Sequence, residues 1–520
     1  MLRGHAPVLV GLLVLGCVYV WLNWLDELGS LHGDGLIYFL TAMEYAPYWP
    51  EDPLAEAVAG TTQFPPVYSF LLMLCGGGAS FLAAHVATTV FLVASFAAFY
   101  VWLTALGIGR LRACAGAVLF AMLPGTFLQS FYLHPEGLYI ALVFAAFAWL
   151  EAGERSLRPG YFWCASVAIA LAFLTRTAGV TLLPGLAIVL LRHRPRGWIA
   201  MAVLPVIPAA AWSIGHRPAM SYTEALVSKY GSGASLEAII EDVAGLVVHV
   251  AEGLGWNVVQ SEGLLATGIL LGCIAAVVAH GRFARGKADA WYLMAYLGVL
   301  AVWPYPQEAW RLTWVVVPIL LGYLLLAGEL LYARAGALAE GLRSAVRLLP
   351  IVALALLVVP GFTLSMTRAV HAVMLGEPEL RHVPHWYEPD GPGARLRARS
   401  QFGTVQALRE FARLIPEGEC VFSSSPLVTA YFTDRNVSFT PWDYRDDRAF
   451  DDEIARSGCR YFVMLGIRTR YKAPFYPRDR LAGRLQIVAE HRVGGEHAGG
   501  PVVAMLGVLK TGSIAVEPGS

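Results

Sequence analysis

The chain has 520 residues, of which 57% are hydrophobic and 15% are charged, and its formal net charge is zero. A soluble globular protein carries roughly 25% charged residues, so this composition argues against an ordinary soluble enzyme and indicates a polytopic α-helical membrane protein. The balanced charge gives no reason to expect nucleic acid as a partner.

Eleven apolar stretches are candidate membrane spans. The first, Ala6–Leu25, follows a basic start and has no small-residue cleavage site after it, so we expect it to be retained. Several others fall short of the roughly 20 residues that a full crossing needs. These are either tilted or half-spanning segments, or helices lengthened by less apolar flanks. The other ten stretches are Leu82–Leu106, Ala113–Leu133, Gly137–Leu150, Tyr161–Leu174, Ala178–Leu191, Gly197–Ile214, Gly263–Ala279, Ala288–Trp303, Leu312–Leu331 and Leu348–Ser365.

The orientation in the membrane follows from the basic residues between these stretches. Every second connection carries arginine or lysine, and the others carry almost none. By the positive-inside rule, this alternation places the N-terminus in the cytoplasm and everything after Ser365 outside the cytoplasmic membrane. This orientation requires that the short run Tyr68–Cys75 does not cross the membrane, so we expect an interfacial or partly inserted helix there. The basic connections contain Arg3; Arg110 and Arg112; Arg155 and Arg158; Arg192, Arg194 and Arg196; Arg282, Arg285 and Lys287; and Arg334, Arg343 and Arg347.

The composition changes near residue 368 and predicts the domain organisation. Residues 1–368 form a transmembrane domain with outer loops at 26–81 and 215–262, the second of them long and amphipathic. A linker rich in Pro, His and Gly over 369–400 leads to a water-soluble segment, 401–520. In that segment a helical pattern alternates with strand-like runs, which predicts a small α/β domain. The predicted helix is Gln401–Leu414, and the predicted strands are 420–424, 461–465 and Val502–Leu509.

Two cysteines of this soluble segment, Cys420 and Cys459, each stand at the start of a predicted strand. In an oxidising compartment they would form a disulfide. Two unpaired buried thiols are an equally good interpretation, because spacing in the sequence does not establish the geometry that a disulfide needs.

The first outer loop is acidic and contains Asp34. No Lys or Arg lies between Asp26 and Pro65. Asp34 is flanked by two glycines and precedes an expected helix over Leu36–Ala46. Two interpretations are open. The carboxylate either caps that helix, or it acts as a general base that takes a proton from an attacking hydroxyl.

Later outer connections add further candidates. Glu136 is either a favourable charge in the first turn of a helix or an acceptor for a sugar hydroxyl. His134 is a polar interfacial residue or a metal ligand, and a single His without a spaced partner predicts no metal site. Arg176 and Arg311 lie on the side where positive charge is disfavoured, so each is expected to have an anionic partner. The alternative for Arg176 is an interfacial side chain that snorkels to water. The alternative for Arg311 is a local ion pair with Glu308. Two outer arginines suit a phosphate.

A series of short motifs runs in order along the chain. They are Gly33-Asp34-Gly35 with Tyr38; Phe64-Pro65-Pro66-Val67-Tyr68; His134-Pro135-Glu136; Leu174-Thr175-Arg176-Thr177-Ala178-Gly179; Trp310-Arg311-Leu312-Thr313 before Pro318; Ile415-Pro416-Glu417-Gly418; and Gly458-Cys459-Arg460-Tyr461-Phe462-Val463. This ordered set resembles the GT-C superfamily of polyprenyl-phosphate-dependent glycosyltransferases. It is most similar to the branch of protein O-mannosyltransferases and lipid A aminoarabinose transferases, and the likeness covers most of the chain.

The resemblance implies a transferase acting at the outer face of the membrane. A polyprenyl-phosphate sugar would be the donor, and a lipid, a glycan or a protein would supply the acceptor hydroxyl. Asp34 would be the catalytic base of an inverting displacement. The substrate-binding residues would be Tyr38, Tyr68, His134, Glu136, Arg176, Glu308 and Arg311. The family often has a second acid beside the base, where this chain has Gly35, so neither a metal nor another cofactor is expected.

Two other classes of protein compete with this interpretation. A transporter would usually show internal repeats and charged residues near the centres of its spans, and the sequence has neither feature. A non-catalytic membrane scaffold or sensor with an outer binding domain is the third class.

Overall fold

The computed structural model describes residues 6–24, 33–216, 227, 236–258, 264–303, 308–335, 340–388, 391–423, 425–439, 447–466, 481–493 and 500–510. The chain divides into two units. The first comprises Met1–Asp26 with Ile37–Thr367, and the second comprises Glu27–Leu36 with Arg368–Ser520.

The first unit is helical throughout its described part. Its helices are α1 (Ala6–Leu22), α2 (Gly33–Glu44, whose first residues belong to the second unit), α3 (Pro53–Thr61), α4 (Val67–Leu74), α5 (Phe81–Ala105), α6 (Arg110–Ala121), α7 (Pro124–Gln129), α8 (Glu136–Ser156), α9 (Pro159–Thr175), η3 (Thr177–Leu182), α10 (Leu183–His193), α11 (Trp198–Val203), α12 (Val206–Gly215), α14 (Leu236–Val258), α15 (Leu264–Phe283), α16 (Ala288–Ala301), α17 (Ala309–Trp314), α18 (Val317–Arg334) and α19 (Glu340–Met374, whose last residues belong to the second unit).

Each predicted span falls on one helix or on two consecutive helices, which confirms the predicted helical membrane fold. In the described chain, five helical segments are long and apolar enough to cross a membrane, and shorter apolar helices stand between them. The third predicted span is broken because Pro124 starts a new helix, α7, after α6 has ended at Ala121. The five long segments are Phe81–Ala105, Glu136–Ser156, Trp198–Gly215, Trp310–Arg334 and Glu340–Met374.

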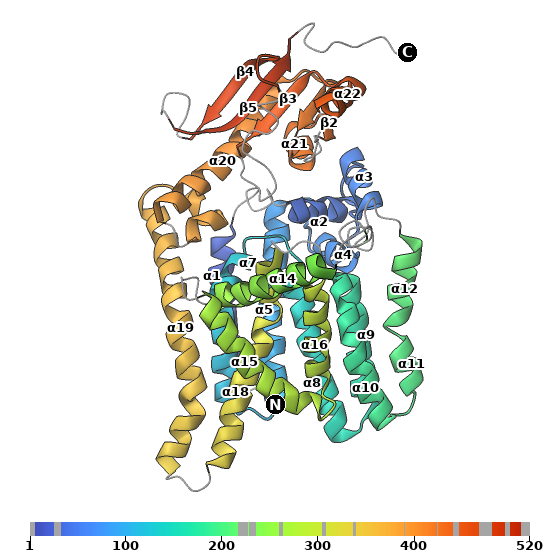
Figure 1. The fold of residues 1–520 in the computed structure, drawn as a ribbon, viewed down its shortest axis with the longest axis vertical. Coiled ribbons are helices and arrows are strands. Elements are labelled where there is room, and N and C mark those ends of the chain that lie inside the picture. The colour runs from blue at the N-terminus through green and yellow to red at the C-terminus, as the bar shows by residue number, and fades with distance from the viewer. Residues whose placement is uncertain are drawn as a thin grey trace. The chain divides into compact units, whose positions relative to one another are not determined.

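Helices α5, α8 and α9 lie side by side in the bundle (Figure 1). Trp102 of α5 stacks on Phe144 of α8, with ring centroids 5.0 Å apart. Gly137, at the start of α8, permits a close approach, because a Cβ there would stand 3.1 Å from the backbone of Leu92 in α5. The first turn of α8 is therefore held directly against α5.

The run Tyr68–Cys75 largely coincides with α4, a helix of 8 residues that begins at Val67 and ends at Leu74. At 1.5 Å per residue it is about 12 Å long and cannot cross a bilayer. Its residues Tyr68 and Leu72 are fully buried. The length of α4 agrees with the expectation that this run does not cross the membrane.

The second outer loop contains α14, and the rest of residues 215–262 is described only at 215, 216 and 227. Figure 1 shows α14 running across the direction of the bundle helices, and it packs against α15 and α17. Leu246, Leu254 and Val258 are buried on one side, whereas Ile240 and Val247 are exposed. The helix is thus present, and its position along a membrane surface stays a prediction.

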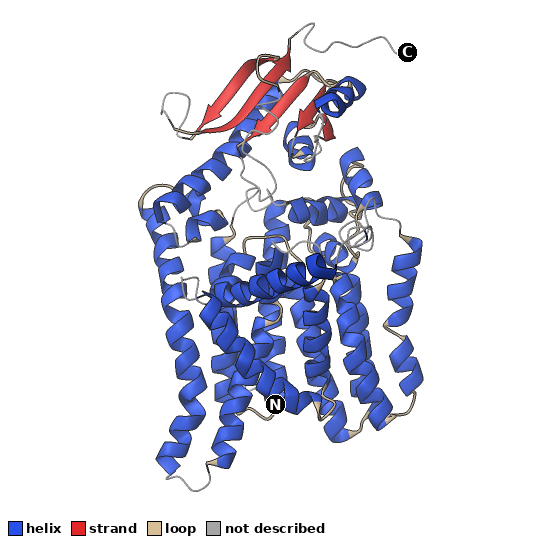
Figure 2. Cartoon of the chain, viewed as in Figure 1, coloured by secondary structure: helices blue, strands red, loops and turns tan. Residues whose placement is uncertain are grey.

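In its described part, the second unit contains a mixed sheet of five strands in the order β2-β1-β3-β5-β4 (Figure 2). Strand β1 pairs in parallel with β2 and β3, while β5 is antiparallel to β3 and β4. Helix α20 packs on β4 and β5, and α21 packs on β1 and β2. The elements are η5 (Pro378–His382), η6 (Pro384–Tyr387), α20 (Gly391–Leu414), β1 (Cys420–Ser423), α21 (Pro426–Thr433), β2 (Asn436–Phe439), α22 (Asp447–Ser457), β3 (Tyr461–Leu465), β4 (Leu485–Arg492) and β5 (Val502–Leu509).

The three predicted strands are β1, β3 and β5, which are the interior strands of this sheet. The two strands that the sequence did not predict, β2 and β4, form its edges. Most of β4 is only partly buried, and its sequence includes Gln486, Glu490 and His491. Edge strands with polar residues show only a weak hydrophobic pattern in the sequence. This explains why β2 and β4 were not predicted.

Residues 369–400, expected as a linker, contain regular structure. They hold the end of α19, both short 3₁₀ helices and the first part of α20. Helix α20 begins at Gly391, ten residues before the predicted helix, and buries Ala394 and Ala398. Pro392 favours this position because proline is tolerated in the first turn of a helix.

Cys420 and Cys459 form a disulfide, with their Cα atoms 4.6 Å apart. Phe422, Ile454 and Phe462 form a hydrophobic cluster around it. Of the two alternatives that the sequence left open, the structure therefore has the disulfide.

Candidate functional site

Glu136 and Arg176 form a buried ion pair at adjoining helix ends. Glu136 lies in the first turn of α8, and Arg176 directly follows α9. Arg176 Nη1 donates to Glu136 Oε1 at 2.6 Å, and the two side chains are 12% and 2% exposed. Each charge also suits its helix end, since acids stabilise N-termini and bases stabilise C-termini. The anionic partner expected for Arg176 is thus Glu136.

Arg311 of α17 joins this pair. Its Nε lies 3.4 Å from Glu136 Oε1, and its Nη2 donates to Glu308 Oε2 at 3.3 Å. The expected local pair with Glu308 is therefore present, but that carboxylate is 34% exposed. Two guanidinium groups consequently converge on one buried carboxylate, that of Glu136.

His134 connects Arg311 to Gln129. The His134 Nε2 atom lies 3.4 Å from Arg311 Nη1, and its Nδ1 atom lies 3.3 Å from Gln129 Oε1. A guanidinium can only donate hydrogen bonds, so Nε2 accepts and Nδ1 carries the proton. His134 is therefore neutral in this arrangement, and Gln129 must turn its carbonyl oxygen toward it.

Hydrogen bonds from other helices hold α17, and with it Arg311, in place. Asn257 of α14 donates from Nδ2 to the Trp310 carbonyl at 2.6 Å. The Tyr296 hydroxyl of α16 donates to the Leu312 carbonyl at 3.0 Å. Trp314 Nε1 donates to Thr126 Oγ1 at 2.9 Å. The position of Arg311 therefore depends on contacts from three other helices.

The predicted residues Tyr38 and Tyr68 belong to one aromatic group with Phe64. The Tyr38 ring stacks on Phe64 at 4.7 Å and meets Tyr68 edge-on at 5.0 Å. The hydroxyl of Tyr68 is hydrogen-bonded to Thr88 Oγ1 at 2.7 Å. Tyr68 thus packs the first loop onto α5, and Tyr38 packs against Tyr68.

Asp34 lies in the first turn of α2 and belongs to the second unit, whereas Glu136, Arg176 and Arg311 belong to the first. The described part of α2 begins at Gly33, so Asp34 is inside the helix instead of preceding it. The predicted cap of a helix starting at Leu36 is therefore wrong. A carboxylate in the first turn is still favoured by the positive end of the helix.

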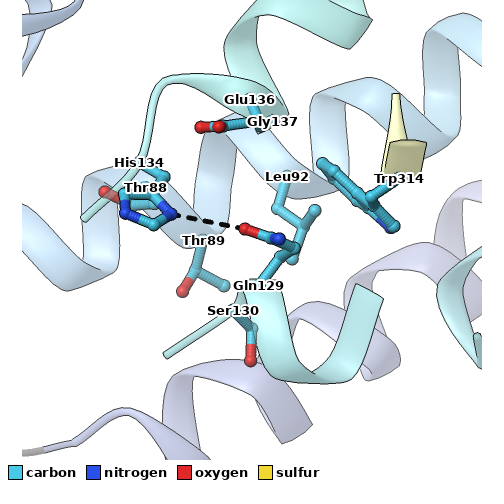
Figure 3. A pocket seen from close by; sticks show the side chains of 9 residues that line it. All are labelled: Thr88, Thr89, Leu92, Gln129, Ser130, His134, Glu136, Gly137 and Trp314. Atoms are coloured by element: carbon cyan, nitrogen blue, oxygen red, sulfur yellow. Dashed lines mark hydrogen bonds between the residues drawn. The ribbon is translucent and has the colours of Figure 1, made fainter. Parts of the chain in front are cut away.

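A small pocket opens beside Glu136 (Figure 3). It is lined by residues of α5, α7, α8 and α17, together with Ser130 and His134. Among the described residues, no three His, Cys, Asp or Glu side chains come together in a way that could hold a metal ion. The lining residues are Thr88, Thr89, Leu92, Gln129, Ser130, His134, Glu136, Gly137 and Trp314.

Several residues of this region were not among the predicted site residues, and Gln129, Asn257 and Tyr296 are three of them. Gln129 stands inside a predicted span, Asn257 in the second outer loop, and Tyr296 in another span. Polar groups within membrane segments tend to be functional. That signal could have identified Gln129, but nothing local in the sequence marks Asn257 or Tyr296.

No family model matches the sequence, and no curated protein matches it either. Among solved structures, the chain is similar to the crystal structure of ArnT from Cupriavidus metallidurans bound to undecaprenyl phosphate. The identity is 12%, the match covers 99% of this chain and 99% of that chain, and the TM-score is 0.48. For the same protein in the apo state, the identity is 12%, the coverage is 97% and 98%, and the TM-score is 0.47.

Proposed function

We propose that this chain is a membrane glycosyltransferase that moves a sugar from a polyprenyl phosphate to an acceptor hydroxyl at the outer face of the membrane. One observation carries the proposal: Arg176 and Arg311 converge on the single buried carboxylate of Glu136, at 2.6 and 3.4 Å. Two forked guanidinium groups match the oxygens of a phosphate. The order of the sequence motifs supports the same donor.

The proposed reaction is a direct displacement. Asp34 accepts the proton of the acceptor hydroxyl, whose oxygen attacks the anomeric carbon. The bond from that carbon to the phosphate oxygen breaks, and polyprenyl phosphate leaves with the electron pair. Arg176 and Arg311 stabilise the charge of the leaving phosphate. Attack opposite the leaving group inverts the anomeric centre.

The local structure supports these roles. Glu136 lies 2.6 Å from Arg176 and 3.4 Å from Arg311, so both guanidinium groups are positioned at one place. Asp34 and Tyr38 are four residues apart on α2 and therefore share one face of that helix. The disulfide between Cys420 and Cys459 suits an oxidising compartment and thus an outer second unit.

Deleting the gene tests the proposed activity. We expect mass spectrometry of the cell envelope to show that one hexose or pentose substituent is lost from a lipid, a glycan or a protein. The wild-type gene should restore it, and the Asp34→Asn variant should not. An unchanged envelope would contradict a transferase and favour a scaffold or a transporter. Equal restoration by the variant would contradict the role of Asp34 as the base.

The topology is tested by cysteine labelling. In a background that keeps only Cys420 and Cys459, we expect a membrane-impermeant maleimide to label Lys510→Cys in intact cells. The matched variant Arg196→Cys, in a connection expected inside, should react only after permeabilisation. Both positions are exposed. The reverse pattern would place the motif loops on the wrong side for a lipid-linked donor.

A further inference from the structure

Three buried polar atoms around the pocket beside Glu136 have no hydrogen-bond partner within the described chain. They are Glu136 Oε2, Gln129 Nε2 and Thr89 Oγ1. The three residues are 1%, 4% and 2% exposed. They come from α8, α7 and α5, and all three border the same space (Figure 3).

Such a concentration of buried polar atoms without partners indicates a ligand. An unsatisfied buried donor or acceptor costs about 1–3 kcal/mol, and most buried polar groups in proteins are hydrogen-bonded. The pocket has room for one group of about the size of a water molecule. One small polar group placed there would satisfy several of these atoms at once.

The chemistry of the three atoms identifies that group. Glu136 Oε2 can only accept a hydrogen bond, Gln129 Nε2 can only donate one, and Thr89 can do either. The orientation of the Gln129 amide is established independently, because the neutral His134 donates to Gln129 Oε1. The ligand must therefore both donate and accept, which the hydroxyl of a sugar and a water molecule can both do. A phosphate diester has no proton to donate to Glu136, and a cation has no lone pair for Gln129.

We propose that this pocket is a subsite for one hydroxyl of the donor sugar, with Thr89 as a residue that determines specificity. The inference rests on the proposed function and adds the sugar's position to it. Glu136 joins the two parts of the site, because its Oε1 atom holds Arg176 while its Oε2 atom borders the pocket. A sugar hydroxyl bound there would lie next to a phosphate on the arginines.

Binding measurements with Thr89→Val test the subsite. Valine has nearly the same shape as threonine, so the fold should be kept while the hydroxyl is lost. The probes are sugar-free undecaprenyl phosphate and undecaprenyl phosphate carrying glucose, mannose, galactose or aminoarabinose. For the tightest sugar-bearing lipid we expect affinity to fall about 5- to 10-fold, the effect of one hydrogen bond. Affinity for the sugar-free lipid should stay unchanged.

Two further variants serve as controls. Thr89→Ser keeps the hydroxyl and should restore most of the affinity for the sugar-bearing lipid. Ser95→Ala removes another buried hydroxyl of α5, one that donates to the Leu92 carbonyl and does not line the pocket. It should leave the affinity for both kinds of lipid unchanged.

The outcomes separate this inference from the proposed function. If Thr89→Val lowers the affinity for none of the lipids, or lowers it equally for all of them, the pocket holds an ordered water only and the subsite is overturned. The same conclusion follows if the wild-type protein binds every sugar-bearing lipid no better than the sugar-free one. If the wild-type protein binds none of these lipids, both the subsite and the proposed function are overturned.

Discussion

Replacing Asp34 by asparagine should lower turnover by at least about 100-fold, the lower end of what general-base catalysis contributes. Asparagine has nearly the same shape, but it cannot take a proton from the acceptor hydroxyl at neutral pH. Because Asp34 lies in the first turn of α2, the lost charge should also cost about 0.3–1 kcal/mol of helix stability. Turnover is measured with the donor and acceptor found by envelope analysis, and stability by thermal unfolding.

The chain offers a matched control in the same outer loop. Asp52 caps α3, with its carboxylate accepting from the backbone N–H groups of Leu54 and Ala55 at 2.8 and 3.0 Å. Asparagine is an equally good cap, so Asp52→Asn should retain both stability and turnover. Wild-type turnover in Asp34→Asn would leave this carboxylate with a helical role only, and the base would have to be sought at Glu136.

Replacing Arg176 by alanine should lower turnover by about 100- to 1000-fold, as expected when a preorganised donor to a developing anion is lost. Affinity for sugar-free undecaprenyl phosphate should fall as well, because in the proposed mechanism the arginine binds the phosphate before and after transfer. Lysine should rescue only partly, since it offers a point charge in place of a fork. Arg311→Ala should also lower both turnover and affinity for the lipid. Binding and single-turnover rates are the measurements.

Folding must be separated from binding in this experiment, because removing one partner of a buried ion pair costs about 3–5 kcal/mol. Arg282 is the matched control. It is 5% exposed and pairs with Asp289 and Glu151, at 2.7 and 2.5 Å, in a second buried cluster of the first unit. Arg282→Ala should lose comparable stability, while the folded fraction keeps its lipid affinity. Unchanged affinity in both Arg176→Ala and Arg311→Ala would remove the phosphate site from the proposal.

Some contacts of the charged residues could be predicted from the sequence. The outer position of Arg176 indicated an anionic partner, and the spacing of Glu308 and Arg311 indicated a local ion pair. Both interactions are present. The sequence did not indicate that Glu136 is the partner of both arginines. Glu136 and Arg176 are 40 residues apart, and only the packing of α8 beside α9 brings their ends together.

The sequence by itself determined the apolar helices and the interior strands β1, β3 and β5, because burial of a whole element leaves a continuous pattern in its residues. It did not determine the edge strands β2 and β4, which become strands by pairing with a neighbour. It also did not reveal the pocket of Thr89, Gln129 and Glu136, whose members come from three helices. Hydrophobic periodicity is a local property, whereas the meeting of polar side chains depends on helix packing, and only the tertiary structure decides that.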